Sequence, residues 1–177
     1  MGITVLEENY QRIREGHPTL TAYLTDCAER AARIQIEMRS IFNHITPYLC
    51  TVCENKCCEG FPLEGWFSLE DYILFRTKYA RPVPPPNRIN NSCACSFVTQ
   101  KGCSLPEDLR PFTCVKINCS TVTEVLRERG EEEHFNQLIT GLDVIHRDVS
   151  GRIKEHKVPF VSPGAQGDTT TNLFHNL

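Results

Sequence analysis

The sequence predicts a mainly α-helical protein, in which helices form a scaffold around an irregular, cysteine-rich metal-binding core with at most short strands. Two observations predict this fold class. Apolar residues recur at helical spacing in long stretches on both sides of the middle of the chain. Nine of the ten cysteines lie within residues 50–119. At 177 residues the chain fits one domain, which we place at residues 1–156, followed by an extended or mobile tail at 157–177.

The N-terminal third is predicted to contain two helices. A short amphipathic helix is expected within residues 1–17, where Gly16 and Pro18 end the pattern. The clearest helix spans residues 19–46, with an apolar residue at nearly every third or fourth position. Pro18 suits its first turn, where the missing N–H costs nothing. Pro47 ends the pattern, because proline breaks a helix interior.

Two more helices are predicted on either side of a proline-rich loop. The helix at 69–79 has Ser68 as its expected N-cap and acidic residues in its first turn. Residues 81–92 hold four prolines in a short space, which excludes a helix or a central strand and predicts a stiff loop inside the domain. The last helix covers 121–155, with a break or kink expected at Gly130.

Composition excludes several classes of protein. The chain has a net charge of −3, whereas most nucleic-acid-binding domains are strongly positive, so no nucleic-acid partner is expected. No apolar run approaches the roughly 18 residues of a membrane span. The first residues also lack the basic and apolar regions of a secretory signal. The sequence thus predicts a cytoplasmic protein with an unidentified protein or small-molecule partner.

This compartment determines how the cysteines are interpreted. In a reducing cytosol, clustered cysteines indicate metal binding or redox catalysis rather than disulfides. Close neighbours such as Cys57 and Cys58, or Cys93 and Cys95, are also poorly placed to bridge each other. Thiolates are soft ligands that favour zinc, iron–sulfur clusters or cuprous copper. We therefore expect a thiolate metal site.

The first ligand group runs from Cys50 to Cys58. Cys50 and Cys53 have the two-residue spacing that lets both sulfurs reach one ion from a tight turn. Cys57 and Cys58 are adjacent, so in an extended backbone their side chains diverge. One can then face a first metal and the other a second, and this pair predicts more than one metal atom.

The second ligand group consists of Cys95, Cys103 and Cys114, with Cys93 and Cys119 nearby. Basic residues recur among the cysteines and could offset the negative charge of a thiolate site; they are Lys56, Lys101, Arg110 and Lys116. Two further residues bear on the ligand set, from which Cys27 is excluded and to which His44 is an alternate. Cys27 lies on the apolar face of the helix at 19–46, where a free cysteine acts as a small hydrophobe. His44 is the alternate ligand, because it precedes Cys50 by six residues.

Three motifs occur in order along residues 50–119. They are Cys-x2-Cys-x3-Cys-Cys at 50–58, Cys95-Ser-Phe-Val followed by Gly102-Cys103-Ser-Leu, and Leu-Arg-Pro-Phe-Thr-Cys at 109–114. In this order they resemble the YkgJ-type cysteine-cluster family, described as a zinc- or iron-chelating domain or as Fe–S-cluster-containing proteins. The family often has proline after the cysteine that matches Cys95, where this chain has Ser96.

That resemblance implies a ligand set, which is Cys50, Cys53, Cys57, Cys58, Cys95, Cys103 and Cys114. Cys119 is added as an eighth ligand because it closely follows Cys114. Cys93 matches no regular position of the family. The cofactor expected on these ligands is an iron–sulfur cluster or zinc, with more than one metal atom.

Three functions fit the sequence. The first is a cytosolic protein that holds an iron–sulfur or polynuclear zinc cluster in a redox, metal-handling or regulatory role. The second is an enzyme that uses the cluster, either an oxidoreductase or a protein-modifying enzyme; no substrate-side motif supports it. The third is an interaction module with purely structural zinc, which needs only four ligands. The first function accounts best for the number of cysteines.

Overall fold

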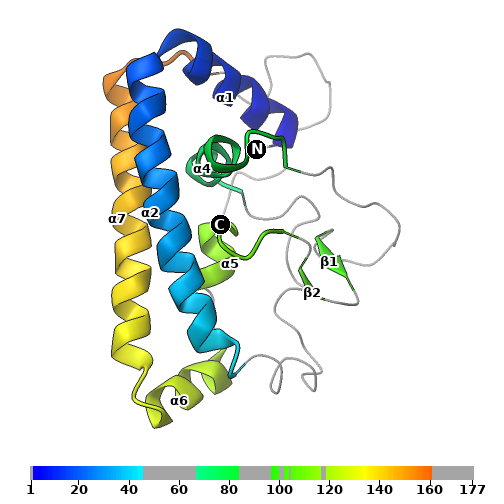
Figure 1. The fold of residues 1–177 in the computed structure, drawn as a ribbon, viewed down its shortest axis with the longest axis vertical. Coiled ribbons are helices and arrows are strands. Elements are labelled where there is room, and N and C mark those ends of the chain that lie inside the picture. The colour runs from blue at the N-terminus through cyan, green and yellow to red at the C-terminus, as the bar shows by residue number, and fades with distance from the viewer. Residues whose placement is uncertain are drawn as a thin grey trace, which may run out of the picture.

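The computed structural model describes residues 2–45, 67–83, 97–99, 102–103, 105–116 and 119–160. This part of the chain is mainly helical, which confirms the helical prediction (Figure 1). Its helices are α1 (Ile3–Gly16), α2 (Pro18–Phe42), α4 (Leu69–Tyr79), α5 (Phe112–Lys116), α6 (Ser120–Glu128) and α7 (Glu132–Glu155). Two short antiparallel strands, β1 (Val98–Thr99) and β2 (Gly102–Cys103), pair with Val98 opposite Cys103.

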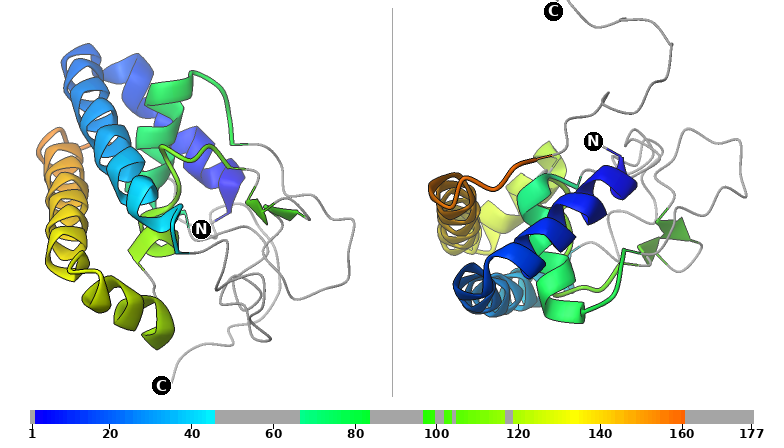
Figure 2. Two further views of the ribbon diagram at one scale, coloured as in Figure 1. Left: turned by 60° about the horizontal axis from the view of Figure 1, so that its bottom comes forward. Right: turned by 90° about the horizontal axis from the view of Figure 1, so that it is seen from above.

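The two longest helices, α2 and α7, lie side by side and antiparallel, and the other elements are arranged around them (Figures 1 and 2). The Phe42 and Phe135 rings meet 4.9 Å apart at one end of the pair, and Arg152 lies over Tyr23 near the other end. Helices α1 and α4 pack on α2. The β1–β2 hairpin lies on the side of α4 and α5 that faces away from α2 and α7 (Figure 2).

The core lies between α2, α4 and α7. Leucine, isoleucine and alanine residues of α2 and α7 recur at helical spacing and are almost completely buried. Cys27 is fully buried among them, as its place on the apolar face predicts. Helix α4 contributes four consecutive buried side chains from Tyr72 to Phe75. None of the described helices is long and apolar enough to cross a membrane.

Several helices begin where local sequence signals predict. Ser68 caps α4 and forms a capping box with Asp71, and Pro18 is the first residue of α2. Helix α2 ends earlier than predicted, at Phe42, and residues 43–45 form a turn. The predicted start of the last helix at residue 121 makes Ser120 its expected N-cap. In the structure Ser120 is already helical, and the residue at the N-cap position of α6 is Cys119.

Two segments differ from simple expectation. Short apolar pieces at Phe97 and Val98, and at Val115 and Ile117, predict small strands. Val98 does lie in β1, whereas Val115 belongs to α5. At the other end of the chain, Val158, the second residue of the predicted tail, is buried in the core. Residues 161–177 lie outside the described residues.

Gly130 forms the break between α6 and α7 with φ of +69°. A Cβ at this position would meet no atom within 4 Å, so substitution costs only backbone strain. We expect Gly130→Ala to destabilise the protein by about 1 kcal/mol. Gly151→Ala, in the interior of α7 and equally free of contacts, is the control and should stabilise by about 0.5–1 kcal/mol. Urea unfolding of both variants checks the prediction, and the same sign for both would contradict it.

Candidate metal centre

The structure places three of the eight predicted ligands. Cys103 lies in β2, Cys114 lies in α5, and Cys119 is the exposed residue that precedes α6. The other five predicted ligands lie outside the described residues, as does Cys93; they are Cys50, Cys53, Cys57, Cys58 and Cys95. Within the described part of the chain, no group of three or more histidine, cysteine or acidic side chains is arranged to hold a metal ion. The gathering of the eight cysteines therefore stays a prediction.

Two other predictions concern residues beside this centre. His44 is exposed in the turn that follows α2. Lys56 and Lys101 lie outside the described residues, whereas Lys116 ends α5 with its ammonium group 5.4 Å from the centre of the Phe112 ring. The longest described segment of the candidate centre is thus 105–116, which ends in the helix that carries Cys114.

The first half of this segment is attached to α2 and α4 through side chains. Leu105 and Leu109 are buried in the core. The Tyr79 hydroxyl, at the end of α4, donates a hydrogen bond to Asp108. Arg39 of α2 forms an ion pair with Glu107. These contacts hold residues 105–109, which lead into the Leu-Arg-Pro-Phe-Thr-Cys motif, against α2 and α4.

Gln35 of α2 holds the motif by its backbone. Its side-chain N–H donates to the carbonyl oxygen of Arg110 at 2.8 Å, and its side-chain oxygen accepts from the N–H of Arg110 at 2.7 Å. Gln35 is only 3 % exposed. One amide side chain therefore satisfies both backbone groups of a single residue, as a neighbouring strand would. The Nε of Arg110 is buried and has no hydrogen-bond partner among the described residues.

Asp71 holds the start of α5 from the side of α4. One carboxylate oxygen accepts from the N–H of Ser68 at 3.0 Å, and the other accepts from the N–H of Phe112 at 2.8 Å. The Nε2 of His146, on α7, lies 3.3 Å from this second oxygen. Burial raises the pKa of Asp71, while His146 and the two backbone N–H groups act in the opposite direction.

The Phe112 ring connects this carboxylate and imidazole to α5. The ring lies 4.9 Å from the His146 ring, at an interplanar angle of 38°. Helix α5 is thus held by α4 through a hydrogen bond and by α7 through a ring contact. In Figure 1, α5 lies below α4, and it packs against α7.

Sequence reasoning missed the roles of Gln35 and His146. In sequence His146 resembles an isolated surface or core histidine, yet it lies four residues after Leu142 and three before Val149, within the buried stripe of α7. Gln35 likewise lies between the buried Ala31 and Met38 of α2. A polar residue inside an apolar stripe was the available signal, because such groups are buried only with partners.

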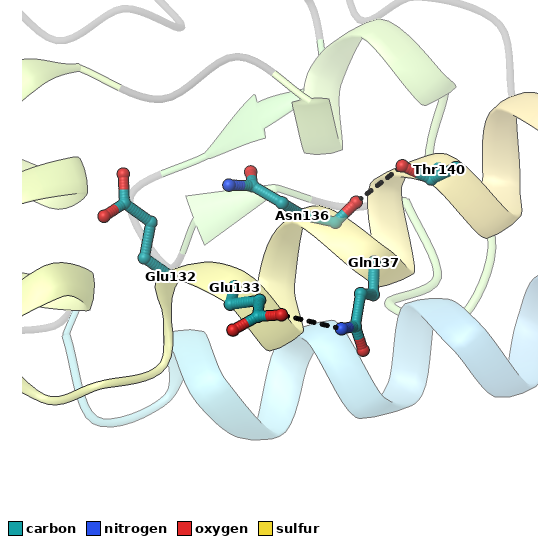
Figure 3. A pocket seen from close by; sticks show the side chains of 5 residues that line it. All are labelled: Glu132, Glu133, Asn136, Gln137 and Thr140. Atoms are coloured by element: carbon teal, nitrogen blue, oxygen red, sulfur yellow. Dashed lines mark hydrogen bonds between the residues drawn. The ribbon is translucent and has the colours of Figure 1, made fainter.

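A separate hollow of about 510 Å³ lies at the N-terminal end of α7 (Figure 3). Its lining comes from this helix alone, namely Glu132, Glu133, Asn136, Gln137 and Thr140. Gln137 donates to Glu133, and the Thr140 hydroxyl donates to the carbonyl oxygen of Asn136. The Glu132 carboxylate pairs with Arg127 of α6 at 2.9 Å. These polar groups thus have partners within α7 or on α6, and no predicted metal ligand lines the hollow.

Comparison with protein-family models, with curated proteins and with solved structures finds no match to this chain.

Proposed function

We propose that this chain is a cytosolic protein whose cysteine thiolates hold an iron–sulfur or polynuclear zinc cluster, with a redox, metal-handling or regulatory role. The proposed ligands are the eight predicted cysteines, from Cys50 to Cys119. The resemblance to the YkgJ-type family supports this assignment through the order of its three motifs. Eight clustered thiols also exceed the four that one structural zinc requires.

The observation that carries the proposal is how the Cys114 segment is held. Helices α2, α4 and α7 all direct buried polar or aromatic contacts to residues 110–112, immediately before Cys114. Metal ligands need this support, because outer-shell contacts orient them and tune the metal. A surface loop without a ligand needs no such attachment.

Metal and sulfide analysis of anaerobically purified protein tests the proposal. Iron with acid-labile sulfide and a charge-transfer band near ~400 nm would identify an iron–sulfur cluster. Colourless protein with more than one zinc per chain would identify polynuclear zinc. Protein that is folded by circular dichroism yet carries neither metal, even after anaerobic reconstitution, would refute the proposed function.

A further inference from the structure

Three polar side chains from three helices converge on the short stretch 110–112. Gln35 comes from α2, Asp71 from α4 and His146 from α7. Gln35 and Asp71 are each 3 % exposed, and the side chain of His146 is 12 % exposed. Buried polar groups are costly unless they are hydrogen-bonded. The hydrogen bonds that Gln35 and Asp71 make across the fold all end on backbone groups of Arg110 and Phe112.

Helix α5 needs this external support. It has five residues, and isolated helices shorter than about 12 residues are marginal in water. Among the described residues that flank it in sequence, the buried ones nearest to it are Leu109 and Pro111, which precede it. Val115 of α5 also packs against the core. The groups that hold the first residue of α5, the Asp71 carboxylate and the ring of His146, therefore set its orientation together with this packing.

The supporting groups and the thiol belong to different sides of α5. Phe112 turns its ring to His146. Cys114 lies two residues further along, and residues two apart in a helix do not share a face. Asp71 and His146 therefore support α5 on a different face from the one that carries Cys114.

We propose that Asp71, Gln35 and His146 are positioning residues that fix the backbone of α5 and so determine where the Cys114 thiolate points. The inference rests on the proposed function, in which Cys114 is a metal ligand. It predicts that these residues control how firmly the metal is held without contacting it. Substitutions in such outer shells typically change metal affinity by about 10–100-fold.

The test compares Asp71→Asn with Asp143→Asn. Asp143 lies on α7, its side chain is 45 % exposed, and it pairs with Arg147 one turn along the same helix, so it is the matched control. Each protein is purified with its native metal and mixed with excess EDTA, and metal release is followed over time. We expect Asp71→Asn to release metal about 10–100-fold faster, and to shift the thiolate–metal absorption bands, while Asp143→Asn behaves as wild type. For zinc protein, the bands are recorded after cobalt substitution.

Gln35→Met gives an independent arm, because it removes both hydrogen bonds to Arg110 and leaves the capping box of α4 intact. It decides the question if Asp71→Asn fails to fold. Release rates and absorption bands equal to those of the control, in every folded variant, would overturn the positioning role.

A failure of the proposed function can be distinguished from a failure of the positioning role. If wild-type protein holds no metal, that function fails, and amide hydrogen exchange over residues 112–116 then tests the positioning role by itself. Faster exchange in Gln35→Met and Asp71→Asn than in Asp143→Asn would support it, and equal exchange would overturn it.

Discussion

Glu7→Gln is expected to destabilise the protein by about 3 kcal/mol, because it removes the only charge that balances a buried arginine in the described fold. Arg76 of α4 donates two hydrogen bonds to the Glu7 carboxylate of α1, at 2.7 and 2.8 Å, and its side chain is 5 % exposed. The Tyr72 hydroxyl donates to the same carboxylate at 2.5 Å. Glutamine keeps the shape of the side chain but leaves the guanidinium buried without a counter-charge.

Glu29→Gln is the matched control for this loss. Glu29 also pairs with a basic residue of α4, Lys78, at 2.7 Å, but its own side chain is 49 % exposed. Exposed pairs contribute at most about 1 kcal/mol. Urea unfolding followed by circular dichroism measures both variants, and equal losses of stability would contradict the burial argument.

The contribution of Glu7 to the free energy of unfolding also depends on pH. Burial raises the pKa of Glu7, but the hydrogen bonds from Arg76 and Tyr72 outweigh this and lower it from 4.5. Between the folded and unfolded pKa values the unfolded state binds more protons, so this stabilisation is complete above 4.5 and is lost as pH falls through the folded value. The stability difference between wild type and Glu7→Gln should therefore shrink in acid.

The helices that sequence predicted well are those with local signals. Ser68 and Asp71 give α4 a capping box, and Gly130 supplies the positive φ that separates α6 from α7. Pro18 begins α2, where proline is tolerated. Each of these signals acts within a few residues, so it can be recognised without knowledge of the tertiary structure.

Helix α5 shows why other features escaped prediction. Val115 and Ile117 are two residues apart, a spacing that favours a strand. The structure instead makes Phe112–Lys116 helical and holds its first N–H with Asp71, which is 41 residues away in the sequence. A contact of that range leaves no periodicity or cap signal. The convergence of Gln35 and His146 on the same segment was hidden for the same reason.

The candidate site was predicted from the spacing of the cysteines, the expected compartment and a family resemblance. The structure adds the helical support around Cys114, but spacing does not show how Cys50–Cys58 and Cys95–Cys119 come together, because metal ligation depends on distances between segments. The identity of the metal depends on the same distances and on charge around the sulfurs. Solution chemistry is the direct route to both.

Cys114→Ala is expected to have the largest effect on the proposed centre. A missing ligand removes a strong bond and leaves an open coordination position, so the variant should lose most of its metal during purification. Cys27→Ala is the matched control, since it also deletes one thiol but acts on a fully buried core residue of α2. Its effect should be confined to the modest stability loss of a small core truncation.

The number of metal atoms per chain in wild type, Cys114→Ala and Cys27→Ala, measured in parallel on anaerobically purified protein, tests the central claim most directly. We predict that wild type and Cys27→Ala carry the same amount of metal, more than one atom per chain, and that folded Cys114→Ala carries far less. Equal metal content in all three proteins would contradict the assignment of Cys114 as a ligand. A selective loss in Cys27→Ala would place the centre elsewhere.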